Sequence, residues 1–309
     1  MNILVVRTDK LGDFITALPA IYVLKQHNPK NKIIVCVAPL NRELAVACEF
    51  IDEVIVDDGL GMWSFVKKLW HVKADASITL FSNTRVAFAQ FLARIPIRIA
   101  PATKIAQIFY TSRVKQRRSE VKMAEFEYNL ALTKELFSDI DLSYKKPLLD
   151  FKIDKSPRSG ICFHVGFGGS SDANWTLDEY VELIDEALKN HKITLTFGPD
   201  ETELMQTMKE KLKAREVEFY LSNSGIVEFA KYITRFRLFV STSTGTYHLA
   251  SLVGTPTMTF FADSLFASFK RWKAIGDEKL QQHFMIAHAK DKRQEVFESV
   301  KISLSKGKQ

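Results

Sequence analysis

The sequence predicts an α/β protein made of two doubly wound halves, and three observations support this prediction. Short β-branched runs alternate with amphipathic helical patterns through the first half of the chain. A segment rich in Lys, Pro and Ser interrupts this alternation at 144–160, and the alternation then starts again. Strands that alternate with helices form parallel sheets covered on both faces. The 309 residues are also enough for two cores of ordinary size.

In the first half, apolar β-branched runs predict strands, and periodic runs between them predict helices. The expected strands are 2–7, 32–37, 53–56, 76–80 and 97–99. The expected helices are 15–27, 42–50, 62–71, 85–93 and 125–137. Pro19 has no N–H to donate, so the first helix is expected to begin close to it or to bend there.

In the second half the same reasoning gives strands 160–165, 193–197, 217–221, 238–241 and 257–261. The expected helices are 177–190, 202–214, 226–234, 247–253 and 294–304. The segment between the halves divides the chain into 1–150 and 151–309. The pattern leaves open that the last helix, at about 294–306, packs back on the first half. A site is expected between the halves, at the carboxyl ends of the strands.

Composition narrows the possible classes of protein. Hydrophobic residues make up 46% and charged residues 26%, as in a soluble globular protein, and no apolar run is long enough to span a membrane. The N-terminus predicts a strand rather than a signal peptide. Three scattered cysteines favour reduced thiols in the cytoplasm and show no metal-ligand spacing.

The net charge of +7 indicates an anionic partner, such as nucleic acid, an anionic membrane or a phosphorylated substrate. The basic residues concentrate in 98–122, where Glu120 is the single acid. A solvated surface and a docking surface for a phosphorylated or carboxylated acceptor explain this run equally well.

The first candidate site is the run Arg-Thr-Asp-Lys-Leu-Gly-Asp at 7–13, directly after the first expected strand. Gly12 permits a tight turn, and Asp13 follows at the start of the next helix. A carboxylate there can accept a proton from an incoming hydroxyl as a general base. Asp is also a common helix cap, and at this point that role explains Asp13 at least as well.

A second candidate is the loop 164–175, which follows the first strand of the second half. Gly166, Gly168 and Gly169 offer backbone N–H groups, and Ser170 and Ser171 offer hydroxyls, that can surround a phosphate. His164 could be a ligand or a structural histidine at the strand end, and the sequence favours neither. The loop lacks the Gly-Lys-Ser/Thr ending of a P-loop and the spacing of a GxGxxG motif.

Two further strand ends carry polar side chains. In the run 241–249, the N–H groups of Thr244, Gly245 and Thr246 lie at a helix start and suit a diphosphate. The alternative is a Ser/Thr-rich helix cap without a ligand. Glu201 follows another strand and could bind ribose hydroxyls, although an acidic first helical turn explains it equally well.

Together these segments resemble glycosyltransferase family 9, the ADP-heptose:lipopolysaccharide heptosyltransferases of Gram-negative bacteria. The resemblance rests on Arg-x-Asp-x-Leu-Gly-Asp followed by Pro19, the stretch ending in Trp175, Phe-Gly-Pro-Asp-Glu at 197–201 and Ser-Thr-Gly-x-x-His-Leu at 243–249, in that order. It implies a GT-B fold, in which two Rossmann-like domains face each other across a cleft. The first domain would bind the acceptor and the second the nucleotide sugar.

The resemblance also implies an inverting transfer that uses no metal and no cofactor. The donor would be an ADP-sugar and the acceptor an anionic, lipid-linked saccharide, with peripheral contact to the inner membrane. Asp13 would be the base. The acceptor would be faced by Arg85, Arg113, Arg117 and Arg118. The donor would be bound by Lys10, Gly12, Gly168, Ser170, Ser171, Glu201, Ser224, Ser243, Thr244, Gly245, Thr246 and His248.

Two positions depart from the family pattern. Ala173 stands where many heptosyltransferases carry Lys, and Ser243 stands where some carry Asp. Without that Lys, the diphosphate loses a charge-assisted contact worth about 1.5–3 kcal/mol. Either Lys10 or Arg7 could substitute, or the donor could differ; we hypothesise that Lys10 substitutes.

Other classes of function make different predictions. A nucleic-acid-binding protein would fit the charge, but the strand-end motifs predict pockets rather than grooves, so no nucleic-acid partner is expected. A sugar-nucleotide epimerase with a hydride-carrying cofactor would need a GxGxxG motif after the first strand, which the sequence lacks. A family member with another donor or acceptor, or one without activity, is kept open by Ala173 and Ser243.

Overall fold

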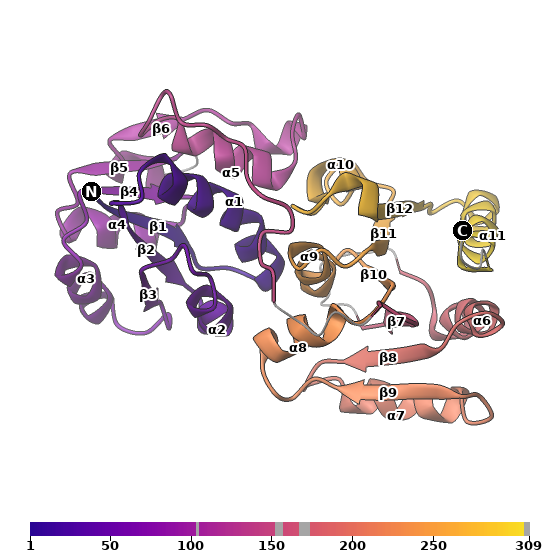
Figure 1. Cartoon of the computed structure of the whole chain (residues 1–309). Coiled ribbons are helices and arrows are strands. Elements are labelled where there is room, and N and C mark those ends of the chain that lie inside the picture. The colour runs from indigo at the N-terminus through magenta and orange to yellow at the C-terminus, as the bar shows by residue number, and fades with distance from the viewer. Residues whose placement is uncertain (103–104, 152–156, 167–173, 306–309) are drawn as a thin grey trace. The chain divides into compact units, whose positions relative to one another are not determined.

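The computed structural model describes residues 1–102, 105–151, 157–166 and 174–305. It divides into two compact units, Met1–Lys145 and Lys146–Gln309 (Figure 1). The boundary lies slightly before the predicted one at 150, because the start of the linker already packs in the second unit. There the Leu149 N–H donates to the Leu252 carbonyl at 3.3 Å.

The first unit is a parallel sheet of six strands in the order β3-β2-β1-β4-β5-β6. The strands are β1 (Asn2–Arg7), β2 (Lys32–Val37), β3 (Glu53–Val56), β4 (Ala76–Thr79), β5 (Ile97–Pro101) and β6 (Ser112–Val114). The helices are α1 (Leu11–His27), α2 (Arg42–Val46), α3 (Met62–His71), α4 (Thr84–Leu92) and α5 (Glu125–Thr133), with short 3-10 turns η1 (Pro39–Asn41), η2 (Ile105–Phe109) and η3 (Arg118–Glu120).

The second unit repeats this topology, with the strand order β12-β11-β10-β7-β8-β9. Its strands are β7 (Ile161–His164), β8 (Ile193–Phe197), β9 (Val217–Leu221), β10 (Leu238–Thr242), β11 (Thr257–Ala262) and β12 (Gln281–Ile286). Its helices are α6 (Leu177–Leu188), α7 (Thr202–Lys211), α8 (Ile226–Ile233), α9 (Gly245–Leu252), α10 (Phe269–Trp272) and α11 (Lys290–Ser305), with the 3-10 turn η4 (Glu278–Leu280). The prediction of two doubly wound α/β halves is confirmed.

Burial explains the sequence pattern of the strands. Five of the six residues of β1, and five of the six of β2, are buried. Such continuous apolar runs are typical of parallel strands that helices cover on both faces. In each unit the strand order reverses at the centre, between β1 and β4 and between β7 and β10. Open α/β sheets bind ligands at the carboxyl ends of the strands beside such a switch point.

The first helix begins earlier than predicted. Helix α1 starts at Leu11 and contains Pro19, so the expectation that it begins near the proline is wrong. Proline removes the N–H that would bond to the carbonyl four residues earlier, which is that of Ile15. One residue further on, the buried Asn129 side chain of α5 donates to the Thr16 carbonyl at 3.1 Å. Ten buried residues along α1 outweigh the lost hydrogen bond.

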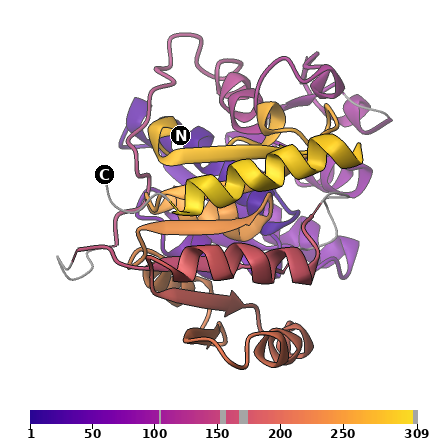
Figure 2. The same cartoon turned by 90° about the vertical axis from the view of Figure 1, so that its right-hand side faces the viewer.

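The last helix belongs to the second unit. Phe297, Val300 and Leu304 of α11 are part of the core of the second unit, whereas the expectation that 294–306 packs back on the first half stays a prediction. Helix α11 lies beside α6, as Figure 2 shows. Within the described ranges, no helix is both long and apolar enough to cross a membrane.

Candidate functional site

Asp13 lies in the first turn of α1, at the carboxyl end of β1. Lys10 occupies the N-cap position, and no side chain caps this helix. The capping role that the sequence left open for Asp13 is therefore wrong. Instead, Asp13 Oδ1 accepts a hydrogen bond from Arg7 Nη2 at 2.6 Å. The carboxylate is 20% exposed, so it is both held in place and reachable from solvent.

Arg7 is the centre of a buried charge network that the sequence did not reveal. Its side chain is 1% exposed, its Nε donates to Asp9 Oδ1 at 2.8 Å, and its Nη1 lies 3.3 Å from Glu125 Oε1. Glu125 also accepts a hydrogen bond from Arg118. Burial alone lowers the pKa of Arg7, but the carboxylates of Asp9, Asp13 and Glu125 outweigh it and raise that pKa overall. Arg7 is thus a permanent cation that fixes Asp13.

This pairing corrects one prediction. Arg7 was a candidate cation for the donor diphosphate, but its guanidinium is already bound by three carboxylates. Lys10, the other candidate, is exposed at the start of α1.

Asp9 gives the network a predicted pH dependence. Burial, with a smaller contribution from the nearby Asp13 carboxylate, raises the pKa of Asp9 to about 6, against the opposing effect of Arg7. Because this pKa lies above the ordinary value of 3.8, the folded state holds the proton more tightly than the unfolded state does. The resulting stabilisation is present below pH 4 and is lost as the pH rises through 6.

We therefore expect Asp9 to reduce the free energy of unfolding by about 1–3 kcal/mol between pH 4 and pH 6. Urea unfolding at several pH values measures this change. In the Asp9→Asn variant the decrease should disappear. If the variant showed an equal decrease in the free energy of unfolding, the decrease would have to come from another titrating group.

The four arginines predicted for the acceptor do not share one role. Arg85 Nη1 donates to Asp57 Oδ1 and Oδ2, at 2.7 and 2.5 Å, and the guanidinium lies over the Phe65 ring. Arg118 is bound to Glu125 and is 15% exposed. The charges of Arg85 and Arg118 are thus compensated by carboxylates.

The remaining two arginines are more accessible. Arg113 lies on the edge strand β6 and is exposed, and Arg117 is 73% exposed and pairs with Glu120 at 3.2 Å. These two suit contact with an anionic acceptor better than Arg85 and Arg118 do.

In the second unit, the turn from β10 to α9 presents a helix start that no side chain caps. Thr244 is the N-cap residue, and its hydroxyl lies 2.9 Å from the Thr246 hydroxyl instead of accepting from a helix N–H. The Ser243 N–H donates a hydrogen bond to the Phe260 carbonyl at 2.9 Å. The first N–H groups of α9, beginning with Gly245, thus remain able to bind an anion.

Buried polar atoms gather close to this turn. Within the described residues, Ser241 Oγ, Thr242 Oγ1 and His248 Nδ1 are buried and have no hydrogen-bond partner. Unpartnered buried polar groups are rare and often mark a ligand or water site. Burial lowers the pKa of His248 to about 4, so its imidazole is neutral at pH 7. His248 can therefore donate or accept a hydrogen bond here, but it brings no positive charge.

Glu201 is the N-cap residue of α7, but its carboxylate does not cap that helix. It turns back to accept from the Gly198 N–H at 2.7 Å and lies 3.8 Å from His164 Nε2. A Cβ on Gly166 would lie 1.8 Å from Glu201 Oε1, so only glycine fits beneath the carboxylate. Burial lowers the pKa of His164, although Glu201 opposes this effect. The sequence pointed to His164 and Gly166 as loop residues but did not reveal that both lie against Glu201.

The other predicted donor residues are placed as follows. Gly12 is the second residue of α1, and Ser224 is exposed in the turn before α8. Gly168, Ser170 and Ser171 lie outside the described residues, as does Ala173. The described residues contain no group of three or more His, Cys, Asp or Glu side chains that could hold a metal ion.

Residues 62–300 match the profile of Glycosyltransferase family 9 (heptosyltransferase), which covers more than half of the chain. The chain belongs to glycosyltransferase family 9. It is 34% identical, over 89% of its length and 86% of the relative's, to a Haemophilus influenzae protein named as a putative glycosyltransferase. It is 23% identical to lipooligosaccharide heptosyltransferase 2 of Campylobacter jejuni, over 85% of this chain and 81% of that one.

Solved structures confirm the GT-B fold of this family member. The structure of E. coli ADP-heptose lipopolysaccharide heptosyltransferase II matches with a TM-score of 0.78 at 15% identity, covering 98% of this chain and 99% of that one. The E. coli heptosyltransferase WaaC with ADP matches with a TM-score of 0.76 at 18% identity, covering 97% and 100%. The family assignment makes this chain a glycosyltransferase, and it is similar to heptosyltransferases.

Proposed function

We propose that this glycosyltransferase moves a heptose, or a related sugar, from an ADP-sugar to a hydroxyl of the lipopolysaccharide or lipooligosaccharide inner core. The transfer would invert the anomeric centre, need no metal, and take place at the cytoplasmic face of the inner membrane. The observation that carries the proposal is the pairing of Asp13 with the buried Arg7, which holds a carboxylate in place at the carboxyl end of β1 without using it as a cap.

In the proposed reaction, Asp13 accepts the proton of the acceptor hydroxyl. The hydroxyl oxygen forms a bond to the anomeric carbon from the face opposite the diphosphate. The bond from that carbon to the diphosphate oxygen breaks at the same time, and ADP leaves with the electron pair. The proposal requires the strand-end sites of both units to meet the same pair of substrates.

The donor diphosphate would bind at the start of α9. Its negative charge grows as the bond to the sugar breaks, and uncapped N–H groups at a helix start stabilise such charge. The hydroxyls of Thr244 and Thr246 are close enough to each other to contact the same phosphate. Lys10 would supply the cation that Ala173 does not, since Arg7 is already bound by carboxylates.

Thermal shift with a panel of nucleotide sugars tests the donor, and product analysis of the anomeric configuration tests inversion. ADP-heptose should raise the melting temperature most, and turnover should persist in EDTA. Lys10→Ala should weaken donor affinity about tenfold or more, as expected for a hydrogen bond from a charged group. Stabilisation by a UDP-sugar alone would replace the donor assignment, and absence of stabilisation by every nucleotide sugar would contradict the proposal.

Substitutions at Gly166 and Glu201 test whether the donor nucleoside binds beside the Glu201 carboxylate. Gly166→Ala forces the Glu201 carboxylate to move, because the new Cβ would overlap Oε1. We expect Gly166→Ala and Glu201→Ala each to weaken donor affinity by about 1–3 kcal/mol, as for a lost charged hydrogen bond. Calorimetric titration of the two single variants and the double variant measures this.

If both changes act through the same carboxylate, the double variant should bind no more weakly than Glu201→Ala alone. Additive losses would show that Gly166 acts independently of Glu201. Glu203→Ala is a matched control, because Glu203 is an exposed carboxylate on the first turn of the same helix.

A further inference from the structure

Helix α3 turns a tryptophan-bearing face towards solvent. Phe65 and Leu69 are buried in the core of the first unit. Trp63, Lys67 and Trp70 are spaced by four and three positions, so they share the opposite side of the helix. Trp63 is 75% exposed and Trp70 is 56% exposed, and Leu60 just before the helix is 74% exposed. The other two tryptophans of the chain are buried or half-buried.

The neighbouring elements also expose apolar side chains. Helix α4 packs against both α3 and η2. Phe91 of α4 is 48% exposed, and Ile105 and Ile108 of η2 are 72% and 61% exposed. Residues 60–118 hold half of the large apolar side chains that are exposed in the described part of the chain. Isolated exposed apolar residues are ordinary, but a concentration of them indicates a binding surface.

The same segment carries an unusual excess of positive charge. Residues 60–118 contain eleven Lys and Arg but a single acid, Asp75, which gives a net charge of +10. The whole chain has a net charge of +7, so the remaining residues are net negative by three. The positive charge of this protein is therefore concentrated in the segment that also exposes the apolar side chains, although carboxylates outside the segment pair with some of its cations, namely Lys68, Arg85, Arg117 and Arg118.

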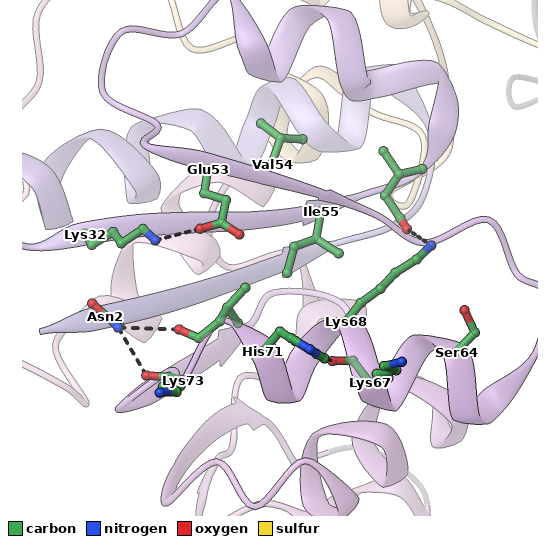
Figure 3. Close-up of a pocket in the computed structure, with 12 residues that line it drawn as sticks. Asn2, Lys32, Glu53, Val54, Ile55, Ser64, Lys67, Lys68, His71 and Lys73 are labelled. Atoms are coloured by element: carbon green, nitrogen blue, oxygen red, sulfur yellow. Dashed lines mark hydrogen bonds and ion pairs between the residues drawn. The ribbon is translucent and has the colours of Figure 1, made fainter.

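A groove of about 770 Å³ lies between α3 and the edge strand β3, beside the tryptophan face. Figure 3 shows Lys67, Lys68 and His71 following one another along α3, with Lys73 just beyond the helix. Lys68 pairs with Asp58 at 3.4 Å. Lys67 and Lys73 are exposed. The groove can thus receive an anionic group next to the exposed tryptophans.

We propose that α3, α4 and η2 form a docking surface for an anionic lipid bilayer. Tryptophan prefers the boundary between lipid and water, because its ring is apolar and its N–H is polar. Lysines beside it would contact lipid phosphates, and each would strengthen binding about fivefold, the factor given by about 1 kcal/mol per basic side chain. Nucleic acid would bind to the basic side chains, but it offers no apolar partner for Leu60, Ile105 and Ile108.

The inference rests on the proposed function in one respect: an acceptor carried on a lipid would be met at such a surface. It is tested without donor or acceptor. Vesicles of phosphatidylcholine alone and of equimolar phosphatidylcholine and phosphatidylglycerol are mixed with the full chain, and binding is measured by flotation. We expect binding to the anionic vesicles only, weakened by salt, with a blue shift of tryptophan emission.

Trp63→Gln with Trp70→Gln should reduce vesicle binding at least tenfold and remove the blue shift. Ile302→Gln is the matched control, because Ile302 is 56% exposed on α11 of the second unit. Lys67→Gln with Lys73→Gln should reduce binding about 25-fold, following the factor of five for each lysine. Lys30→Gln with Lys213→Gln removes the same charge at exposed positions elsewhere and should have little effect.

Three results would overturn the proposal. One is that the wild type floats with neither kind of vesicle. Another is that the double variant Trp63→Gln with Trp70→Gln binds vesicles as well as the wild type does. The third is that the wild type binds no vesicles and is a dimer, which the double tryptophan variant converts to monomers. That result would make the face an interface between copies of the chain. Circular dichroism and the melting temperature verify folding of the variants. Turnover of a lipid-free acceptor should be unaffected, which separates this inference from the proposed function.

Discussion

Asp13→Asn should lower kcat by about 100- to 10,000-fold, the range for loss of a general base. The amide keeps the shape of the carboxylate but accepts protons far more weakly. Arg7 still has Asp9 and Glu125 as partners, so the melting temperature should fall by only a few degrees. Donor affinity should change little, since the carboxylate is expected to act on the acceptor. Initial rates at saturating substrates, with thermal shift by the donor, measure these effects.

Asp9→Asn is the matched control for this prediction. Asp9 binds the same guanidinium, at 2.8 Å, and is exposed to the same degree as Asp13, 21% against 20%. A variant that only disturbs the network should therefore lose as much turnover at position 9 as at position 13. We expect Asp9→Asn to retain most of its kcat at pH 7. Equal losses at both positions would contradict the assignment of Asp13 as the base.

Arg7→Met should produce the largest loss of stability among the variants considered. It leaves Asp9, Asp13 and Glu125 without their shared cation in a site where Glu125 is only 4% exposed. Breaking a buried ion pair by removing one partner costs about 3–5 kcal/mol. For the unit Met1–Lys145 this corresponds to a melting temperature lower by about 10 °C. Calorimetry and urea unfolding measure the loss, and kcat should also fall because Asp13 is no longer fixed.

The double variant Arg7→Met with Asp9→Asn separates charge from packing. Removing one unpaired carboxylate should recover part of the lost stability if uncompensated charge is its cause. Arg85→Met is the comparison, because Arg85 pairs with one carboxylate among the described residues, that of Asp57, and is 28% exposed. Arg85→Met should reduce the free energy of unfolding clearly less than Arg7→Met does. Equal losses of stability in the two variants would show that the three carboxylates around Arg7 contribute no more to stability than the single pair of Arg85 does.

Most of the fold could be predicted because parallel strands buried on both faces have continuous apolar sequences. The strands that the sequence missed, β6 and β12, are both edge strands. One side of an edge strand has no neighbour, so its sequence needs fewer apolar residues. β12 begins with Gln-Gln-His, and β6 consists of Ser-Arg-Val. β6 lies inside the basic run, for which the sequence predicts a solvated surface or a docking surface rather than a strand.

The candidate site was predicted only in part, because local motifs carry no information on distant partners. Asp13, Thr244 and Gly245 were found from their place after strands, since the carboxyl ends of parallel strands form the usual site. The partners of Arg7 could not be predicted, because Glu125 lies 118 positions away in the sequence. A buried arginine at the end of an apolar strand was the one available signal, since such a charge requires compensation.

The same separation affects the order in which the site can form during synthesis. Arg7 and Asp13 leave the ribosome more than a hundred residues before Arg118 and Glu125 do. Until then the guanidinium has two of its three carboxylate partners and no α5 to cover it. Domains generally fold as units during translation. The nascent chain thus acquires a fixed Asp13 only when the first unit is nearly complete.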